Sequence, residues 1–331
     1  MTSSTEQLSR ELGTSGVRGS AVGLGTWAIG GWRWGGTDEA AAIDAIRASI
    51  DEGISLIDTA PAYGLGRSEE IVGRAIAGRR DEVMLSTKCG LVWHTDKGTR
   101  KFEHDGKTVY QYLGADSIVH EVEQSLRRLG TDRIDHYITH WPDVTTPVDE
   151  TMEALMRLKA QGKILSIGAS NVTPELVREY LAAGPLDAVQ EKFNVLDRGL
   201  SDALLPLCRE NGVSVMSYSS LALGLLTGKI GPERRFPEDD LRHGNPRFSV
   251  ETRQKTADFA AAIAPIAEGH GATIAQIVIA WTLAQPGITF ALCGARNPDQ
   301  ARENAGAGRL RLPETDLAKI DAAARRCLAG I

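Results

Sequence analysis

The chain has 331 residues, of which 42% are hydrophobic and 24% are charged. This composition is typical of a globular protein with a large core and excludes a disordered chain. The net charge of -6, without a long block of either sign, argues against nucleic-acid or anionic-membrane partners. Residues 1 to 10 lack the apolar core of a signal peptide, and no apolar run reaches the length of a membrane span, so we expect a cytoplasmic protein.

The cysteines are widely spaced and form no Cys-x-x-Cys pair, which argues against a disulfide framework and against a structural zinc site. We therefore expect free thiols and predict no metal site. Cys89 directly follows Lys88, but we expect it to serve in packing because no neighbouring residue marks it as a nucleophile. The four are Cys89, Cys208, Cys293 and Cys327.

Residues 11 to 25 predict a small hairpin that leads into a strand. Beyond it, short apolar runs alternate with segments of helical periodicity. Strands are predicted at 21–25, 54–58, 83–88, 134–140, 164–170, 186–190, 213–218 and 288–294. Eight strands separated by helices, without a low-complexity linker, predict one domain over residues 1–331: an α/β fold of the (β/α)8 TIM-barrel type.

Helix boundaries are also visible in the sequence. Residues 118 to 129 carry apolar side chains at helical spacing, and Gly130 follows as a suitable C-cap. Thr146 and Thr173, each followed by proline, predict the N-caps of two further helices.

Two connections, 89–114 and 219–247, are longer than ordinary loops, and each follows a predicted strand. Loops after the strands of a barrel lie on its C-terminal face. Long loops at that face usually shape a substrate or cofactor site.

Polar residues end the predicted strands, at the face where such barrels carry their chemistry. Because all the strands point the same way, these side chains should converge on one rim. Tyr63 follows the first of them on a short loop. The strand-end residues are Asp58, Lys88, His140, Ser170, Gln190, Tyr218 and Gly294.

The pairing of a phenol with an ammonium suggests acid catalysis. A tyrosine has a pKa of about 10 and is a reluctant acid at neutral pH. An ammonium from Lys88 would lower the pKa of the Tyr63 phenol, and Asp58 would keep that lysine charged. His140 could then hold a substrate oxygen, so the four groups would form a proton donor for a carbonyl.

Motifs along nearly the whole chain from Leu12 resemble those of the aldo-keto reductases, most closely a bacterial NADPH-dependent branch. They stand in the order and spacing of that family. The motifs are GLGTWAIGG (23–31), IDTAPAYGLGRSEEIVGRAI (57–76), LSTKCG (85–90), HWPD (140–143), IGASN (167–171), GLLTGK (224–229) and GARNPDQ (294–300).

The resemblance implies a catalytic set of Asp58, Tyr63, Lys88 and His140, each within a matching motif. It also implies that a hydride passes from C4 of the nicotinamide of NADPH to the carbonyl carbon while Tyr63 delivers the proton and His140 orients the carbonyl. A small aldehyde or ketone would be the substrate, reduced reversibly to the alcohol.

The resemblance extends to the cofactor. It places the nicotinamide carboxamide and ring at Ser170, Asn171, Gln190 and Tyr218; the pyrophosphate at Ser219, Leu221, Gly224 and Lys229; and the adenosine end at Gly294, Arg296, Gln300 and Asn304. The fork of Arg296 suits a 2′-phosphate because it donates two hydrogen bonds at once. Position 297 is asparagine, where close relatives often have lysine.

Three tryptophans are candidates for the substrate pocket: Trp27, Trp93 and Trp141. For Trp93, core packing is an equal alternative. Residues 23–28 formally match the dinucleotide fingerprint G-x-G-x-x-A, but the glycines that follow forbid the required helix until about Thr37.

Two other functions stay open at this stage. Lys88 could form a Schiff base in a lyase if burial depressed its pKa, although Asp58 would act in the opposite direction. A barrel of this kind could also serve as a nucleotide-binding, redox-sensing regulatory subunit, which the full catalytic set makes less favourable. The oligomeric state and the identity of the substrate cannot be deduced from the sequence.

Overall fold

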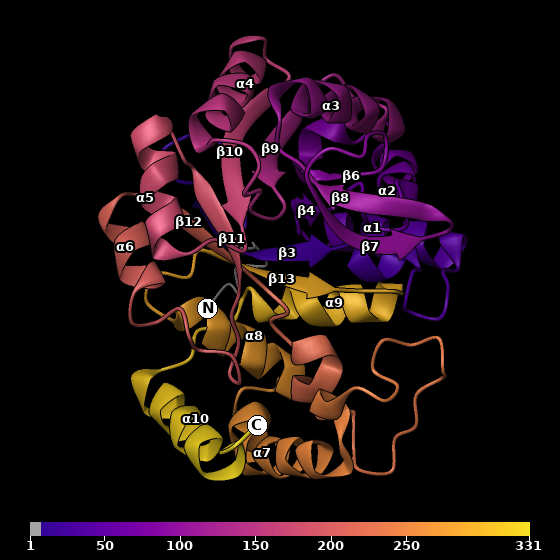
Figure 1. The fold of residues 1–331 in the computed structure, drawn as a ribbon. Helices are drawn as coiled ribbons and strands as arrows, with labels where there is room; N and C mark the ends of the chain where they lie inside the picture. Colours follow the sequence, from indigo (N-terminus) through magenta and orange to yellow (C-terminus); the bar gives the residue numbers. More distant parts are fainter. Residues whose placement is uncertain (1–7) are drawn as a thin grey trace.

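A closed barrel of eight parallel strands forms the centre of the computed structural model, which describes residues 8–331 (Figure 1). The prediction for the first ten residues therefore falls mostly outside the described range. The strands, in ring order, are β3 (Val22–Gly25), β4 (Leu56–Asp58), β5 (Met84–Cys89), β9 (Ile134–Thr139), β10 (Ile164–Ser170), β11 (Ala188–Lys192), β12 (Ser214–Tyr218) and β13 (Phe290–Gly294). The predicted TIM barrel is confirmed.

Helices pack around the outside of the barrel, most of them between successive strands and the last two after β13 (Figure 1). They are α1 (Glu39–Asp51), α2 (Arg67–Ile76), α3 (Ala115–Leu129), α4 (Val148–Ala160), α5 (Pro174–Ala183), α6 (Leu204–Glu210), α7 (Val250–Gly269), α8 (Ile274–Ala284), α9 (Pro298–Ala307) and α10 (Glu314–Cys327).

The predicted N-terminal hairpin is present, as β1 (Ser9–Glu11) paired antiparallel with β2 (Arg18–Ser20). Its turn places Leu12, fully buried, in a cluster with barrel residues such as Met84 and Phe290. Arg10 donates hydrogen bonds to the carbonyls of Ile288 and Thr289, just before β13. The hairpin thus packs against the N-terminal end of the barrel and leaves the C-terminal end for the site.

The long segment 89–114 folds into a small antiparallel sheet instead of an irregular loop. Strands β6 (Leu91–Val92), β8 (Lys107–Gln111) and β7 (Thr99–His104) lie in that order. β7 and β8 are joined by Asp105 and Gly106, both at positive φ (47° and 70°). Asp-Gly is a dipeptide that two-residue hairpin turns favour, so this hairpin had a signal in the sequence.

Helix caps agree with the sequence at two of three positions. Gly130 ends α3 in the left-handed conformation, with φ of 64°. Thr173 caps α5 by accepting a hydrogen bond from the amide of Leu176. The prediction for Thr146 is wrong: its hydroxyl donates to Asp143 instead, and α4 begins after Pro147 without a side-chain cap.

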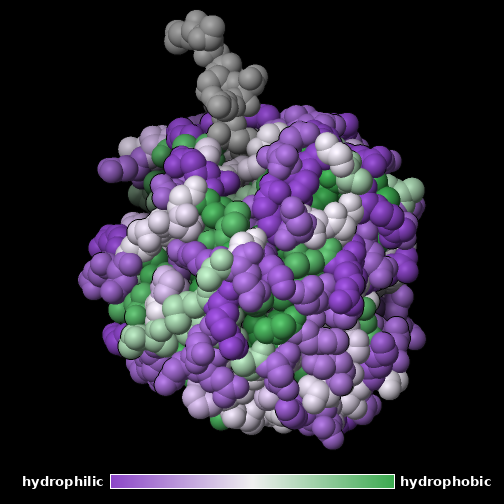
Figure 2. Space-filling view, turned by 90° about the horizontal axis from the view of Figure 1, so that it is seen from above, coloured by the Kyte–Doolittle hydropathy of each residue, from purple (hydrophilic) through white to green (hydrophobic). Residues whose placement is uncertain are grey.

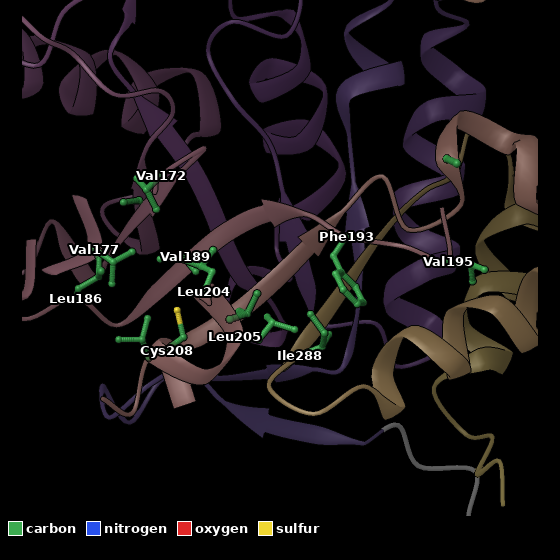
Figure 3. Close-up of a cluster of buried hydrophobic side chains, with 14 of the residues drawn as sticks. Val172, Val177, Leu186, Val189, Phe193, Val195, Leu204, Leu205, Cys208 and Ile288 are labelled. Atoms are coloured by element: carbon green, nitrogen blue, oxygen red, sulfur yellow. The ribbon is translucent and has the colours of Figure 1, made fainter. Parts of the chain in front are cut away.

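Apolar side chains between strands and helices fix the strand ends in place. Figure 3 shows one such cluster, in which Val189 and Phe193 from the β11 region lie near Leu204, Leu205 and Cys208 of α6. On the face shown in Figure 2, hydrophobic residues gather only in small areas between hydrophilic ones. Within residues 8–331 no single helix is long and apolar enough to cross a membrane; α7 and α8 pass that test only as a pair, bent by 87°.

Candidate active site

A buried ion pair lies at the C-terminal end of the barrel. The Lys88 Nζ atom, on β5, lies 2.8 Å from the Asp58 Oδ2 atom at the end of β4, and the side chains are 0% and 4% exposed. Lys88 also donates to the carbonyl of Thr59. The other oxygen of Asp58 accepts hydrogen bonds from Gln190 (2.8 Å) and Ser86 (3.2 Å). Asp58 is thereby held on three sides.

Tyr63 lies beside this pair, with its ring centroid 4.9 Å from the Lys88 Nζ atom. Its position depends on a close approach of two loops. A Cβ atom on Gly30 would lie only 2.6 Å from the backbone of Tyr63, and Gly64 has a positive φ of 71°. Glycine at these two positions lets the loop after β3 pack directly against the tyrosine.

The pKa of the Tyr63 phenol is raised, mainly by burial, although the positive charge of Lys88 acts in the opposite direction. The expected lowering by Lys88 is thus one contribution, and burial outweighs it because the phenolate would lose its water. At neutral pH Tyr63 is a neutral phenol with a proton to give.

Burial lowers the pKa of Lys88, but the charge and hydrogen bond of Asp58, together with Tyr63, outweigh that effect and raise it overall. Lys88 is therefore an ammonium. An ammonium has no free electron pair, so this geometry disfavours the Schiff-base role.

His140 directly follows β9 and completes the group. Its ring centroid lies 5.8 Å from that of Tyr63, nearly perpendicular to it. Burial, followed by the charges of Lys88 and Lys101, lowers the pKa of His140 well below its ordinary value. A neutral imidazole keeps one N–H, which can donate a hydrogen bond to a carbonyl oxygen.

The candidate nicotinamide residues form a connected network. Tyr218 donates to the Asn171 side-chain oxygen at 2.8 Å, and the Asn171 amide nitrogen donates to the carbonyl of His140 at 2.9 Å. The hydroxyl of Ser170 donates to the carbonyl of Gln190. Gln190 itself donates to Asp58, so it links this network to the ion pair.

The residues expected around the pyrophosphate follow β12. Ser219 and Gly224 have positive φ angles, 59° and 101°, and the 3-10 turn η3 (Ala222–Thr227), preceded by Leu221, carries the chain over the rim. Lys229 lies beyond this turn, where its Nζ atom forms an ion pair with Glu303 at 2.6 Å. The charge of Lys229 is therefore already shared with a carboxylate.

The candidate adenosine end lies at the start of α9. Arg296 is exposed and forms no ion pair within residues 8–331; its Nη2 atom donates to the carbonyl of Gly36 at 3.2 Å. Asn297 caps α9 by accepting from the amide of Gln300, whose side chain accepts from the amide of Arg296. Asn304 donates to the carbonyl of Gly294. An exposed guanidinium without an ion-pair partner in the described residues, next to a helix N-terminus, suits a phosphate group.

Two of the three candidate tryptophans lie near the candidate catalytic side chains. The ring centroid of Trp27 is 6.5 Å from that of Tyr63, and Trp141 follows His140 directly. Trp93 lines a cavity of about 130 Å³ behind β6, together with residues such as His120; none of the four catalytic candidates lines it.

Sequence reasoning missed the contribution of the β7–β8 hairpin. Lys101, on β7, places its ammonium 3.9 Å from the ring centroid of Trp141. Phe102 stacks on Trp32 of the loop after β3, with centroids 4.9 Å apart. The Asp105-Gly106 turn was the signal that could have predicted the hairpin, although not its partners.

A (β/α)8 barrel that gathers a carboxylate, an ammonium, a phenol and an imidazole at its strand ends belongs to the class of barrel enzymes with acid–base chemistry. Residues 21–325 match the model of the aldo/keto reductase family. The chain belongs to this family and is an oxidoreductase.

Similar proteins from two bacteria agree with this assignment. The chain is 43% identical to the aldo-keto reductase YhdN of Bacillus subtilis over 87% of this chain and 85% of that protein. It is also 43% identical to the NADH-specific methylglyoxal reductase of Escherichia coli, covering 92% of this chain and 94% of that protein.

Solved structures agree as well. The glycerol dehydrogenase AKR11B4 of Gluconobacter oxydans superposes with a TM-score of 0.88 at 36% identity, over 99% of this chain and 98% of that one. An aldo/keto reductase of Klebsiella pneumoniae, solved with NADP and acetate, gives a TM-score of 0.70 at 31% identity and 92% coverage of both chains.

Proposed function

We propose that this protein reduces small aldehydes or ketones to alcohols, reversibly, with NADPH as hydride donor and Tyr63 as general acid. The observation that carries the proposal is the cluster of Asp58, Lys88, Tyr63 and His140 at the barrel mouth, with the ion pair at 2.8 Å and the phenol beside it. A cytoplasmic location and a small-molecule partner are part of the proposal.

NADPH supplies a hydride when it is bound. The side chains at the strand ends fit such a group: the amide of Asn171 for the carboxamide, the ring of Tyr218 for stacking on the nicotinamide, and the exposed guanidinium of Arg296 for a phosphate. The Klebsiella relative was solved with NADP, whereas the Escherichia coli relative is NADH-specific. Arg296 favours NADPH because NADH has no 2′-phosphate.

Proton transfer is assigned to the chain itself. His140, neutral at neutral pH, donates a hydrogen bond to the substrate oxygen and orients the carbonyl. The O–H bond of Tyr63 breaks and its proton goes to that oxygen as negative charge develops there. The phenolate that remains faces the ammonium of Lys88, whose own charge Asp58 balances, until solvent returns a proton.

The test is NADPH consumption, followed by its near-ultraviolet absorbance, across a panel of aldehydes, ketones and sugars. Tyr63→Phe should lower kcat by about 100- to 10,000-fold, the usual worth of a general acid, while NADPH binding persists. Tyr112→Phe is the matched control, since the Tyr112 hydroxyl donates to Asp116 on α3, outside the candidate catalytic group, and its loss should leave kcat unchanged.

Two results would reject this assignment. Unchanged turnover in Tyr63→Phe would remove the acid role. Tight NADPH binding without turnover of any carbonyl would favour a regulatory subunit, and borohydride trapping of a substrate carbon on Lys88 would favour a lyase.

A further inference from the structure

A cation without an acidic partner among residues 8–331 lies at the mouth of the barrel. The Lys101 Nζ atom is 3.9 Å from the ring centroid of Trp141, the residue after His140. Within residues 8–331 this ammonium forms neither an ion pair nor a side-chain hydrogen bond. The acidic residues of the same hairpin are directed elsewhere: Glu103 pairs with Arg100 at 2.6 Å, and Asp105 approaches His104.

The hairpin that carries Lys101 is fixed in place on both of its strands. Phe102 and His104 pack on the ring of Trp32, at centroid distances of 4.9 and 4.5 Å. On β8, Gln111 donates to the carbonyl of Pro142 at 3.2 Å, one residue beyond Trp141. Lys101 therefore differs from a loose surface lysine, because its strand and the ring beneath it are both held.

The charge of Lys101 reaches the catalytic group. It is one of the charges that lower the pKa of His140, after burial and Lys88. Burial also lowers the pKa of Lys101 itself, and no carboxylate counteracts this. The Lys101 side chain is exposed, so a bound anion can reach its ammonium and supply the charge-assisted contact that the described residues do not.

Neutral carbonyl compounds would leave this cation unused. A substrate that carries a carboxylate or a phosphate beside its carbonyl would bring its oxygen to His140 and its anionic group to Lys101. The cation–π contact with Trp141 would hold the lysine in place for that contact.

We propose that Lys101 is a specificity-determining residue that binds the anionic group of the substrate, so that this enzyme prefers carbonyl compounds bearing a carboxylate or phosphate over their neutral analogues. The proposal rests on the carbonyl-reductase function proposed above and names the substrate class for that same site.

Lys107 offers a matched control on the same hairpin. It lies on β8, with its Nζ atom 5.9 Å from the ring centroid of Trp93, and it is also exposed. Unlike Lys101, it is not among the charges that shift the pKa of His140. Lys107→Met removes one positive charge from the hairpin without touching the proposed anion contact.

The experiment compares kcat/KM for matched pairs of substrates: aldehydic carboxylates of increasing length against their neutral amides, and glyceraldehyde 3-phosphate against glyceraldehyde. The ratio of anionic to neutral kcat/KM should fall about 10- to 100-fold in Lys101→Met, the worth of a hydrogen bond to a charged group. Lys101→Arg should restore most of the ratio, and Lys107→Met should leave it unchanged.

The two substrate series distinguish a carboxylate from a phosphate as the anion. Equal ratios in the wild type and Lys101→Met, with neutral aldehydes still reduced, would overturn this proposal alone. An equal fall in Lys107→Met would also overturn it, because the effect would then come from the general charge of the hairpin. Absence of any carbonyl reduction would reject the proposed function instead.

Discussion

Two sides of the barrel mouth are organised in opposite ways. On the side of β4 and β5, Asp58 and Lys88 are almost completely buried, and each has its partners within the protein. On the side of β13 and α9, Arg296 is exposed and forms no ion pair within residues 8–331, although its guanidinium donates to the carbonyl of Gly36 at 3.2 Å. The charges of Asp58 and Lys88 are balanced within the protein before any ligand binds, whereas the charge of Arg296 is not.

The difference between the two sides fits the roles proposed for them. A proton donor needs a fixed geometry and a low local dielectric, so its charges must be balanced from within. A phosphate-binding group gains most when its donors are still free, because the ligand then supplies the missing acceptors. The four predictions below test this contrast, from the largest expected effect to the smallest.

Removal of one member of the buried pair should have the largest effect. Asp58→Asn leaves the ammonium of Lys88 buried without a counter-ion, which should lower the free energy of unfolding by about 3–5 kcal/mol and abolish most activity. Denaturant unfolding measures the stability, and NADPH consumption measures the activity.

A double variant provides the control for charge. Asp58→Asn combined with Lys88→Met removes both charges and should recover much of the stability lost in the single variant, although not the activity. A double variant as unstable as Asp58→Asn alone would mean that packing, and not the unpaired ammonium, causes the loss.

A second buried carboxylate shows what happens without a paired cation. Glu121 of α3 accepts hydrogen bonds from the amide of Gly90 and the hydroxyl of Ser117, yet burial raises its pKa to about 8. In the unfolded chain this carboxyl loses its proton near pH 4.3. From there to about pH 8 the folded state holds the extra proton, so stability falls as pH rises, by up to about 1.4 kcal/mol per unit.

Glu121→Gln removes this ionisation and should reduce the decrease of stability with rising pH. The free energy of unfolding, measured in denaturant at several values between pH 5 and pH 8, should decline less in the variant than in the wild type. Glu153→Gln, at an exposed position on α4, should keep the wild-type slope. Parallel curves for wild type and Glu121→Gln would show that Glu121 ionises normally in the fold.

Substitution of Arg296 on the exposed side should change cofactor binding and leave the stability of the protein nearly unchanged. Arg296→Met should raise the KM for NADPH about 10- to 100-fold, since it removes a charge-assisted contact. The KM for NADH should change little because NADH lacks the 2′-phosphate. Arg302→Met is the control, since Arg302 lies on α9, just after Arg296 in the chain, and pairs with Asp299. Equal changes for both cofactors would remove the phosphate role of Arg296.

The same contrast explains how far the sequence could predict the site. Asp58, Lys88 and His140 were visible because they end apolar runs, and closure of a parallel barrel brings strand ends together whatever the loops do. Lys101 was not visible, because its contact with Trp141 depends on how a hairpin folds back over the mouth. The raised pKa of Tyr63 also escaped prediction, because burial is a property of the whole fold.

The smallest effect concerns Asn297, which accepts a hydrogen bond from the amide of Gln300 as the N-cap of α9. Asn297→Ala should cost about 1 kcal/mol in the free energy of unfolding, while Asn297→Asp, whose carboxylate caps equally well, should cost little. Denaturant unfolding of both variants measures this.

Because the cap orders the turn that presents Arg296, Asn297→Ala should also weaken NADPH binding slightly, measured by fluorescence titration. A loss of binding as large as that in Arg296→Met would show that the exposed side is as dependent on internal contacts as the buried one.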